Sequence, residues 1–188
     1  MARIVITEFL SLDGVMEAPG GDDDFVRGAW SFEYDRGDEG NQFKVEETME
    51  SAALLLGRRT YEGFAAAWPS REGEFADRFN TMPKYVVSST LEDPEWTNTT
   101  VLSGDLADDI ARLKEEVEGD VIVHGSAQLA AALIEAELVD EVRLMVFPVV
   151  LGTGKRLFGE TSDSRKLKLT RSDAVGDGVL LLVYERAD

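Results

Sequence analysis

The stretch that decides the fold is Val121–Leu129, which reads VIVHGSAQL. It begins with a short apolar run, passes through a glycine and a serine, and enters a helical pattern that continues to Leu133. A continuous run of β-branched residues is typical of a strand that is buried on both faces, as in the sheets of α/β proteins. We therefore predict an α/β fold, with a helix that begins at Ser126 directly after this strand.

The rest of the chain alternates in the same way between apolar runs and helical patterns. Strands are predicted at the apolar runs Ile4–Leu10, Ala53–Leu56, Tyr85–Ser88, Val121–His124 and Val142–Val150. Further helical patterns lie at Val45–Glu50, after Gly57, and after Asp105. Asp105 is of a type that caps helix N-termini, and Ile110, Leu113 and Val117 then share one helical face.

The C-terminal part has a strand pattern of a different kind. Leu167 and Leu169 alternate with polar residues, and Gly176–Gly178 provides a turn into Val179–Glu185. Alternation with a period of two, followed by a glycine turn, is typical of an antiparallel hairpin. No repeat or low-complexity linker divides the sequence, so we predict a single domain over residues 1–188 with a mixed sheet that ends in this hairpin.

The stretch from Glu17 to about Gln42 fits neither pattern. Proline, glycine and acidic residues interleave there with the aromatic residues Phe25, Trp30, Phe32, Tyr34 and Phe43. Long loops in compact domains are usually functional or contain a helix of their own. Two interpretations stay open: a flap that covers a cleft, or a helix with a loop that packs its rings on the core.

Composition excludes several classes of function. The 188 residues include 37 acidic and 19 basic side chains, for a formal net charge of −18, with no cysteine and one histidine. Disulfides, thiolate nucleophiles, zinc ribbons and multi-histidine metal sites are therefore excluded. The chain also lacks a Lys/Arg stripe for nucleic acid and an apolar run of roughly 18 to 20 residues for a membrane span. We expect a cytoplasmic protein that binds no metal, nucleic acid or membrane.

Two predicted strand-to-helix turns have the chemistry of anion-binding sites. The first is Gly57–Thr60, where two arginines stand at a helix start, and the second is Gly125–Gln128. A helix N-terminus carries unpaired N–H groups and a partial positive charge, so it attracts anions such as phosphate and disfavours cations. Thr60 is expected both to cap the first helix and to donate its hydroxyl to that phosphate. Because ligands of open α/β sheets collect at the carboxyl ends of the strands, both turns are expected to face one crevice that suits a dinucleotide.

Each of these assignments has an alternative. The fingerprints GxGxxG and GxxxxGK[ST] are both absent, so neither a standard Rossmann motif nor a P-loop is present. Arg58 and Arg59 are alternatively two arginines that point into solvent. His124, at the end of its strand, is either a residue that lines the core or crevice or a general base.

The turns carry a resemblance to a known family. Gly57–Glu62, GRRTYE, is similar to the GR-x-T-[YW]-E segment of dihydrofolate-reductase-like proteins, as are Ser11–Val15 and Lys84–Thr90. Val123–Ser126 and Phe147–Phe158, FPVVLGTGKRLF, resemble the RibD C-terminal domain, which is the reductase half of bifunctional riboflavin-biosynthesis enzymes and has many stand-alone relatives. These motifs occur in the expected order over nearly the whole chain.

The resemblance implies a three-layer α/β/α sandwich, NADPH as the hydride donor and commonly a homodimer. It implies that the Asp13–Val15 turn borders the nicotinamide. Residues implied to bind the cofactor are Gly57, Arg58, Arg59 and Thr60 at its phosphates, Ser88, Ser89 and Thr90 near the adenosine ribose and its 2′-phosphate, and Gly125, Ser126, Ala127 and Gln128 at the pyrophosphate.

The sequence departs from the family pattern in two ways. It contains no cysteine and hence no deaminase domain, so a role in riboflavin biosynthesis would require a separate deaminase. It also lacks the tryptophan-plus-acid helix of a true folate reductase, which Trp30–Asp35 matches only loosely. Folate is therefore a less favoured substrate.

The expected function is the NADPH-dependent reduction of a small, polar, ring-containing substrate, similar to that of 5-amino-6-(5-phosphoribosylamino)uracil reductase of riboflavin biosynthesis. The alternatives are a non-catalytic NADPH-binding sensor or interaction module, and a dihydrofolate reductase. Asp13 is the first candidate for the proton donor, and Glu33 and Asp35, which would face the substrate, and an ordered water are the others. The alternative for Asp13 is a purely structural role in its turn. Trp30 and Trp68 either stack on a planar substrate or pack in the core.

Overall fold

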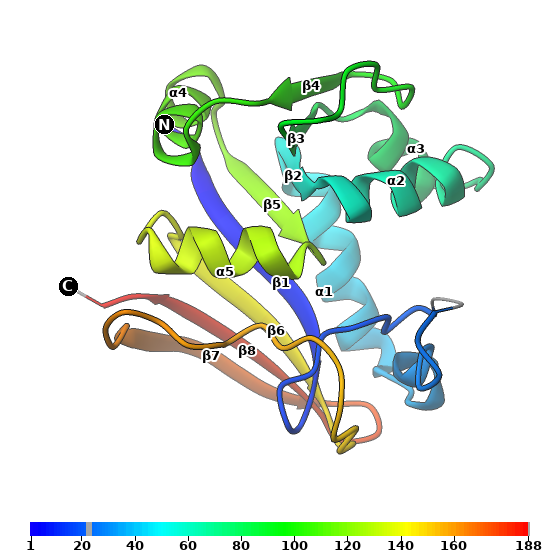
Figure 1. The fold of residues 1–188 in the computed structure, drawn as a ribbon. Helices are drawn as coiled ribbons and strands as arrows, with labels where there is room; N and C mark the ends of the chain where they lie inside the picture. The colour runs from blue at the N-terminus through cyan, green and yellow to red at the C-terminus, as the bar shows by residue number, and fades with distance from the viewer. Residues whose placement is uncertain (22–23, 188) are drawn as a thin grey trace.

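The computed structural model describes residues 1–21 and 24–187, and this part of the chain folds around one eight-stranded sheet (Figure 1). The strands are β1 (Arg3–Ser11), β2 (Ala53–Gly57), β3 (Lys84–Val87), β4 (Thr99–Leu102), β5 (Asp120–His124), β6 (Glu141–Phe147), β7 (Leu167–Val175) and β8 (Val179–Arg186). The helices are the 3₁₀ helix η1 (Trp30–Glu33), α1 (Gly37–Glu50), α2 (Arg58–Ala67), α3 (Glu74–Thr81), α4 (Leu106–Glu116) and α5 (Ala127–Glu135).

The sheet is mixed, as predicted. Its order is β4-β3-β2-β5-β1-β6-β8-β7. The strands from β4 to β6 run parallel, and β8 runs antiparallel to both of its neighbours, β6 and β7. The C-terminal hairpin is confirmed, with Gly176–Gly178 between its two strands. Because the parallel strands point the same way, the carboxyl ends of β3, β2, β5 and β1 line up along one rim of the sheet.

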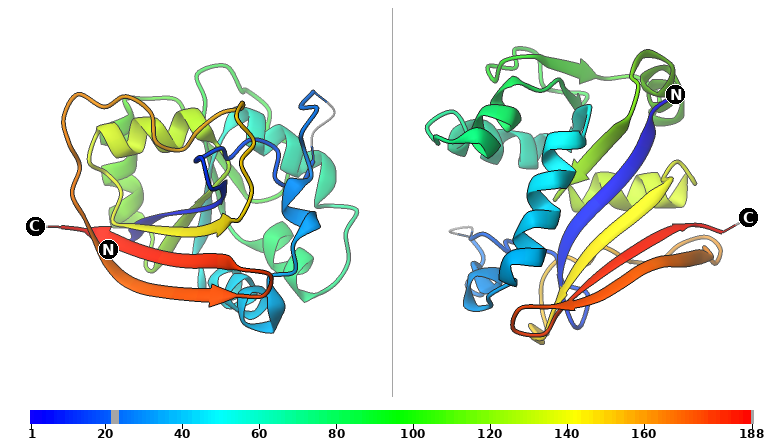
Figure 2. Two further views of the ribbon diagram at one scale, coloured as in Figure 1. Left: turned by 90° about the horizontal axis from the view of Figure 1, so that it is seen from below. Right: turned by 180° about the vertical axis from the view of Figure 1, so that it is seen from behind.

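Helices cover both faces of the sheet, which confirms the three-layer α/β/α sandwich (Figure 2). On one face, α4 and α5 bury Ile110 and Leu133 against Ile6 of β1. On the other face, α2 and α3 bury Tyr61 and Phe79 in a second apolar cluster. Helix α1 crosses this second face beside β1 and β5 (Figure 2, right).

The neighbouring strands β5 and β1 end at different positions along the sheet, and this leaves a gap between them at the rim. β5 pairs with β1 as far as His124, which lies opposite Thr7. β1 continues along β6 to Ser11, which pairs with Phe147. From Glu8 onward, β1 therefore has a strand partner on the β6 side and faces the β5–α5 turn on the other side.

Several element boundaries differ from those predicted. The strand predicted at Val142–Val150 ends at Phe147, because Pro148 has no N–H to donate to a strand ladder. The helical segment predicted at Val45–Glu50 is the last part of α1, which begins at Gly37. β4 and α3 are missing from the prediction because both are short, and short elements depend on tertiary packing more than on their own pattern.

Within the stretch from Glu17 to Gln42, Trp30 and Tyr34 pack on the core, as the helix-with-loop interpretation expects, whereas the ring of Phe32 is 75% exposed. Trp30 is only 2% exposed, donates its indole N–H to the carbonyl oxygen of Glu17 and meets the Phe147 ring edge-to-face. Tyr34 contacts the same Phe147 ring. Asp22 and Asp23, which belong to this stretch, lie outside the described residues.

The ammonium group of Lys84 fastens the start of β3 to its surroundings. The side chain is fully buried and donates hydrogen bonds of 2.8–3.1 Å to the carbonyl oxygens of Asn80, Met82 and Thr97. It also lies 4.3 Å from the centre of the Trp96 ring. Burial lowers the pKa of this amine to about 8. These contacts join the end of α3 and the loop before β4 to β3.

Replacing Lys84 with Met is expected to lower the free energy of unfolding by about 1–3 kcal/mol, because the apolar side chain leaves three buried carbonyl oxygens without a donor. Urea unfolding at neutral pH measures the change. The control is Lys168→Met on the exposed face of β7, which should stay within about 0.5 kcal/mol of the wild type. Equal losses in the two variants would contradict the role given to Lys84.

Candidate functional site

The two turns singled out by the sequence lie side by side, at the carboxyl ends of the adjacent parallel strands β2 and β5. Two hydrogen bonds of 2.9 Å join them: the N–H of Gly57 donates to Oγ of Ser126, and the N–H of Ser126 donates to Oγ1 of Thr60. The Ser126 hydroxyl in turn donates to the carbonyl oxygen of His124. The turns therefore form one continuous rim.

Helices α2 and α5 both begin at this rim without a side-chain cap. Gly57 precedes α2 and Ser126 precedes α5, and neither offers a side-chain acceptor to the first N–H groups of its helix. At α4, by contrast, the carboxylate of Asp105 accepts from two such N–H groups, as predicted. Thr60 does not cap α2, because its hydroxyl accepts from Ser126. Uncapped N–H groups at two adjacent helix starts form a place where an anion is stabilised.

Backbone conformation shapes the second turn. Gly125 and Ser126 have φ angles of 54° and 57°, in the left-handed region that glycine adopts freely and other residues adopt rarely. A Cβ atom at Gly125 would lie 3.1 Å from Oγ1 of Thr60, so glycine is needed for the close approach of the two turns. The strained conformation of Ser126 is held by its hydrogen bonds to the first turn, which is common at functional sites.

The two arginines at the start of α2 differ in their contacts. Arg58 forms a 2.7 Å ion pair with Glu62 and donates to the hydroxyl of Thr90, so it bridges α2 and the loop after β3. Arg59 is exposed, and its guanidinium group contacts no side chain among residues 1–21 and 24–187 through a hydrogen bond or an ion pair. The solvent alternative describes Arg59 in this structure, whereas Arg58 is fixed at the rim.

The loop after β3 belongs to the same rim. The Ser88 hydroxyl accepts from the N–H groups of Thr90 and Leu91 at 3.2 and 3.1 Å, which closes a turn directly after the strand. Ser89 and Thr90 are exposed on this turn. Together with the contact between Arg58 and Thr90, this places the Ser88–Thr90 loop next to the first turn.

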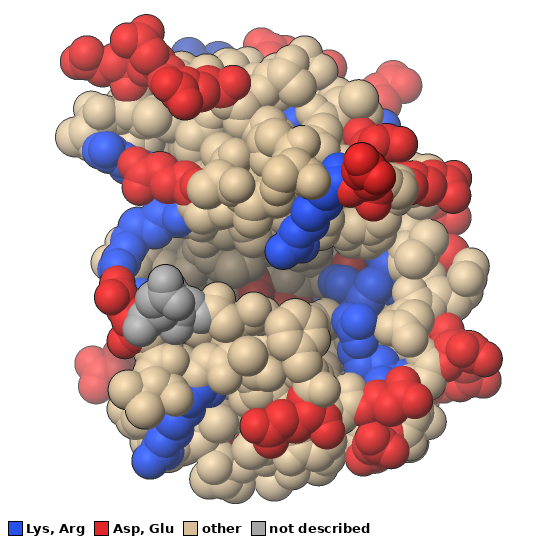
Figure 3. All heavy atoms as spheres, turned by 90° about the vertical axis from the view of Figure 1, so that its right-hand side faces the viewer, with Lys and Arg blue, Asp and Glu red and all other residues tan. Residues whose placement is uncertain are grey.

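The face of the molecule shown in Figure 3 is hollowed. The hollow separates α2 and α3, above, from residues 17–21 and 24–34, below, and comparison with Figure 1 places the end of β5 and α1 behind it. Lys and Arg side chains stand at the edge of the hollow, and acidic side chains are visible on its floor. On a chain with a net charge of −18, such local positive charge favours an anionic ligand.

A group of buried polar side chains lies at the end of β5, on the face covered by α1. Lys44 donates to the hydroxyl of Thr7 at 2.7 Å and pairs with the carboxylate of Glu47, which also accepts from Thr7 at 3.0 Å. Arg143 lies 3.6 Å from the other oxygen of Glu47. Burial alone would raise the pKa of Glu47, but the charge of Lys44 and these hydrogen bonds hold it below its usual value. Glu47 is therefore an ionised carboxylate.

Glu8 follows Thr7 on β1, and its carboxyl group has the opposite character. Glu8 is only 5% exposed, and its Oε1 atom has no hydrogen-bond partner within the described residues. Burial raises the pKa of Glu8 well above its usual value, and the negative charge of Glu47 raises it further. The positive charge of Lys44 and a hydrogen bond from the N–H of Gly125 lower it, but by less. Glu8 therefore keeps its proton at pH values where an exposed glutamate has lost it.

His124 lines the same place in its neutral form. Its ring lies 6.4 and 5.5 Å from the rings of Phe64 and Phe79, measured between centroids. Burial, together with the charge of Lys44, lowers the pKa of His124 to about 3, although Glu47 opposes the shift. A base with so low a pKa is a weak one, so the geometry favours the crevice-lining interpretation over a general base.

Unpaired buried polar atoms lie near the end of β5 on both faces of the sheet, with Glu8 on the face of Ile6 and Leu10 and with Glu47 and His124 on the opposite face. Six buried side-chain N or O atoms of the described residues have no hydrogen-bond partner, and three of them are Oε1 of Glu8, Oε1 of Glu47 and Nε2 of His124. Unpaired polar atoms are costly in a protein interior, and a bound ligand is one way in which they are satisfied. The candidate site therefore comprises the two turns and the adjoining side chains of Thr7, Glu8, Lys44, Glu47 and His124.

Asp13 has the contacts of a loop anchor. Its carboxylate accepts from the Ser11 hydroxyl at 2.7 Å and from the N–H groups of Leu151 and Gly152 at 3.0 and 2.8 Å. Arg156 lies 3.4 Å away. The Ser11 hydroxyl and the backbone amides lower the pKa of Asp13 to about 2. A carboxylate that has lost its proton at neutral pH cannot donate one, so this geometry speaks against Asp13 as the proton donor.

The side chains expected to contact a substrate occupy different places. Trp30 is buried in the core, which is the second of its two interpretations. Trp68 is half-buried and packs on Phe79 with their ring centroids 4.6 Å apart, so most of its surface is used within the protein. Glu33 and Asp35 are exposed around the connection between η1 and α1. The structure therefore does not bring these four residues together at the rim.

Two other cavities lie away from the rim. One of about 640 Å³ lies between the end of α5 and residues 157–167, and one of about 750 Å³ lies between α2 and residues 91–97. Neither is lined by the two turns or by the buried polar side chains. Over residues 1–21 and 24–187 no cluster of three metal-binding side chains occurs, and no helix there is long and apolar enough to cross a bilayer.

Comparison with known proteins places the chain in a family. Residues 2–181 match the family model described as the RibD C-terminal domain. The chain belongs to the RibD C-terminal domain family. This membership implies a reductase role. Two relatives from Bacillus subtilis (strain 168), the uncharacterized proteins YyaP and YwjB, are 27% and 26% identical to it, over 97% and 95% of this chain and 94% and 95% of their own lengths.

Solved structures share its fold. A putative riboflavin biosynthesis protein from Shewanella sp. PV-4 superposes with a TM-score of 0.80 at 22% identity, over 99% of both chains. A pyrimidine reductase-like protein from Corynebacterium diphtheriae superposes with a TM-score of 0.63 at 13% identity, over 99% of this chain and 92% of that one. Dihydrofolate reductase from Enterococcus faecalis, solved with NADP(H), gives 0.59 at 16% identity, over 99% and 97%. The RibD C-terminal domain chain therefore has the dihydrofolate-reductase-like fold.

Sequence reasoning missed the buried polar side chains Glu8, Lys44 and Glu47. One signal was present: Thr7 and Glu8 are two polar residues inside the otherwise apolar strand Ile4–Leu10. A strand that is buried on both faces has no ordinary place for a carboxylate, so a polar pair there indicates a site. Lys44 and Glu47 carry no such signal, because charged residues on a helix usually face solvent.

Asp13→Asn is expected to destabilise the protein at neutral pH and to lose that effect in acid. The pKa of Asp13 falls from 3.8 to about 2 on folding, so its carboxylate contributes stability above the unfolded-state value. That contribution is lost as the pH falls through about 2. Melting temperatures of the wild type and Asp13→Asn, measured against pH, should converge in acid.

The control for this experiment is Asp93→Asn, on an exposed loop. Its melting temperature should follow that of the wild type throughout the pH range. A difference between Asp13→Asn and the wild type that stays constant down to the lowest pH would contradict the anchoring role of the Asp13 carboxylate.

Proposed function

We propose that this protein is an NADPH-dependent reductase of a small, polar, ring-containing substrate. The observation that carries the proposal is the pair of uncapped helix starts at α2 and α5, joined by the hydrogen bonds of Ser126 at the end of two neighbouring strands. A diphosphate carries its negative charge on two adjacent groups. Two adjacent helix N-termini complement that arrangement better than they complement a single phosphate.

The residues at the rim fit the parts of the cofactor in order. Gly57–Thr60 and Gly125–Gln128 would hold the pyrophosphate through backbone N–H groups and the Thr60 hydroxyl. Ser88–Thr90 would hold the adenosine ribose, and Arg58 would reach its 2′-phosphate because its guanidinium group already contacts Thr90. Arg59, which is exposed at the start of α2, would contact the pyrophosphate.

The proposed place for the nicotinamide is the rim where β1 extends beyond β5, next to the Asp13–Val15 turn. NADPH, when bound, supplies the hydride. The chain's own contribution is to bind and orient the two reactants, to exclude water and to provide polar groups for the substrate. The polar groups for the substrate would be the buried side chains of Thr7, Lys44 and Glu47, which lie at the end of β5.

The substrate class follows from these polar groups and from the relatives. The buried Oε1 of Glu8 and Nε2 of His124, which have no hydrogen-bond partner within the described residues, can exchange hydrogen bonds with the ring N–H and C=O groups of a pyrimidine-like substrate. Two of the solved structures that share the fold are a putative riboflavin biosynthesis protein and a pyrimidine reductase-like protein, which supports a substrate similar to 5-amino-6-(5-phosphoribosylamino)uracil. A sensor that only binds NADPH would not require this second set of buried polar groups.

Absorbance of NADPH tests turnover directly. Purified protein is mixed with NADPH and, in separate reactions, with 5-amino-6-(5-phosphoribosylamino)uracil, dihydrofolate and simple ketones. We expect oxidation of NADPH with the aminopyrimidine. Binding of NADPH without turnover of any compound would favour the sensor alternative, and turnover of dihydrofolate alone would favour the folate reductase.

Arg58→Ala and Arg59→Ala are expected to weaken NADPH binding by about 1.5 to 3 kcal/mol each, because each loses charge-assisted hydrogen bonds to phosphate. The two variants should differ in selectivity. Arg58→Ala should bind NADH as the wild type does, since NADH lacks the 2′-phosphate, whereas Arg59→Ala should weaken both cofactors equally. Isothermal titration calorimetry with NADPH and NADH measures all four affinities.

Arg171→Ala provides the matched control, since Arg171 is an exposed arginine on β7 that pairs with Asp173. Its affinity for both cofactors should equal that of the wild type. Unchanged NADPH affinity in both Arg58→Ala and Arg59→Ala would contradict the phosphate assignment.

A homodimer in the cytoplasm is part of the proposal. The edge strand β7 offers unpaired backbone groups and the exposed side chains of Leu167 and Leu169, and such an edge is usually protected in solution. Sedimentation equilibrium is expected to give twice the monomer mass of 20.7 kDa. A monomer at all concentrations would contradict it.

A further inference from the structure

A reductase must deliver a proton to its substrate as well as a hydride, and the acids named from the sequence are poorly suited to this. The carboxylate of Asp13 is used by Ser11 and by backbone amides of the loop that contains Leu151. Glu33 and Asp35 are exposed, so water surrounds their carboxylates. The source of the proton has to be sought among the buried groups at the rim.

Glu8 has the geometry that the other acids lack. It is the first residue of β1 beyond the pairing of Thr7 with His124, so it lies where β1 and the β5–α5 turn face each other. Its residue is 5% exposed, and the N–H of Gly125, which belongs to the proposed pyrophosphate turn, bonds its carboxyl group. Its Oε1 atom has no partner among the residues that the structure describes. A buried carboxyl oxygen with no protein partner, next to the cofactor turn, is available to a ligand.

Glu8 and Glu47 are two buried carboxyl groups with opposite environments. Glu47 is paired with Lys44 and accepts from the Thr7 hydroxyl, so it stays ionised. Glu8 forms no ion pair with residues 1–21 or 24–187, and burial favours its protonated form. Two carboxyl groups whose environments separate their protonation states in this way are typical of acid–base sites. The charged and titratable groups that act on Glu8 are Lys44 and Glu47 of α1, while His124 of β5 is neutral beside them.

We propose that Glu8 is the proton-donating residue of this reductase and that its unpaired Oε1 faces the substrate atom that receives the proton. The inference rests on the proposed function. Neither the family match nor the sequence motifs point to Glu8, since it lies outside every motif that carries the resemblance.

The step balances in atoms and electrons. A C=N or C=O double bond of the substrate is reduced: its carbon takes the hydride with its electron pair, NADPH becomes NADP⁺, and the nitrogen or oxygen takes the proton as the O–H bond of Glu8 breaks. Glu8 is left as a carboxylate, which the positive charge of Lys44 stabilises. A proton from water restores the acid before the next turnover.

The test compares Glu8→Gln with Glu33→Gln and Asp35→Asn. Glutamine keeps the size of Glu8 and can still accept from Gly125, but it has no acidic proton. We expect kcat with the reducible aminopyrimidine to fall roughly 10²–10⁴-fold in Glu8→Gln, the usual range for loss of a general acid. Binding of NADPH by calorimetry should match the wild type, and Glu33→Gln and Asp35→Asn should keep wild-type kcat.

A second readout does not depend on turnover. The carboxyl carbon resonance of Glu8 in ¹³C-labelled protein, assigned by its loss in Glu8→Gln, is followed between about pH 4 and pH 9. We expect its midpoint well above the ordinary value of about 4.3 for glutamate. In the wild type, kcat should fall as the pH rises through this same midpoint, because Glu8 then loses its proton. The residual kcat of Glu8→Gln should show no such fall.

The outcomes separate this inference from the proposed function. A Glu8 resonance that titrates at the ordinary value, or a folded Glu8→Gln variant with wild-type kcat, would overturn the role of Glu8 while leaving the reductase intact. Loss of kcat in Glu33→Gln or Asp35→Asn alone would transfer the role to that acid. A wild-type protein that binds no NADPH would overturn both proposals.

Discussion

The structure of the site depends on the hydrogen bonds that Ser126 makes across the rim of the sheet. Its hydroxyl accepts from the N–H of Gly57, and its own N–H donates to Thr60, so the start of α5 is fixed against the start of α2. Thr60 lies in the first turn of α2, whose N-cap is Gly57, and Ser126, the N-cap of α5, takes a left-handed backbone conformation. Two helix N-termini are thereby held next to each other with their first N–H groups uncapped. These bonds join the turns Gly57–Thr60 and Gly125–Gln128 into one anion-binding cradle, and without them the two turns would be separate.

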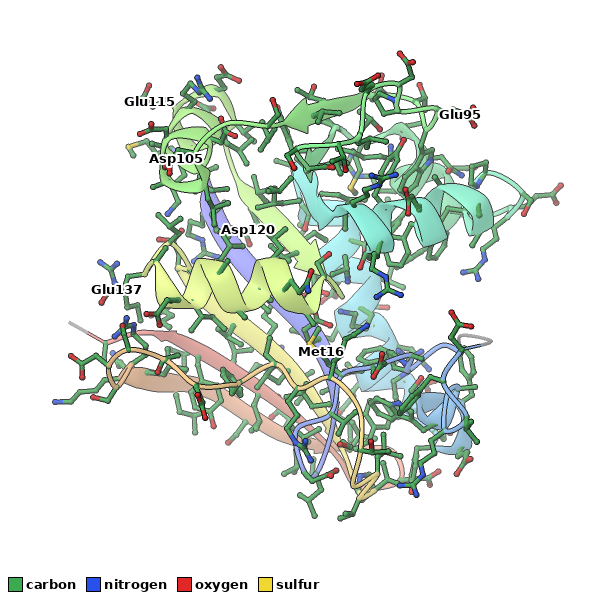
Figure 4. All side chains as sticks on the ribbon, viewed as in Figure 1. Met16, Glu95, Asp105, Glu115, Asp120 and Glu137 are labelled. Atoms are coloured by element: carbon green, nitrogen blue, oxygen red, sulfur yellow. The ribbon has the colours of Figure 1, made fainter. Side chains whose placement is uncertain are left out.

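A second constraint is the unequal length of β5 and β1. Because β5 ends opposite Thr7 while β1 runs on to Ser11, the sheet itself provides a place beside the cradle that no strand fills. The buried polar network of Thr7, Lys44 and Glu47 reaches this place from the α1 face, and Glu8 reaches it from β1. The acidic groups that mark the other end of the molecule are structural by comparison: Asp105 caps α4, and Asp120 at the start of β5 pairs with Arg3 and Arg143 (Figure 4). The ion pairs of Asp120 hold the fold at the amino ends of β5 and β1, away from the rim.

Sequence reasoning could place the cradle but not the polar groups beside it. Val121–Val123 and Leu54–Leu56 are buried on both faces, and a glycine follows each strand, so local pattern alone specifies where the turns fall. The partner of each side chain depends on tertiary structure instead. Asp13 has the same local sequence whether it faces a nicotinamide or a loop 138 residues away, and only the fold brings Leu151 and Gly152 to it. From the sequence alone, Lys44 and Glu47 are expected to face solvent, and only the packing of α1 against β1 brings them to Thr7. Trp30 illustrates the same limit, because its aromatic sequence context does not distinguish a stacking platform from a core residue.

The central claim is that one diphosphate-containing cofactor bridges both helix starts, and a crystal structure of the protein with NADPH tests it most directly. The account predicts the pyrophosphate over the N–H groups of Gly57–Thr60 and Gly125–Gln128 together, with the nicotinamide ring beside β1 where β5 has ended. A cofactor bound in one of the two distant cavities, or a pyrophosphate that contacts only one of the two turns, would contradict it.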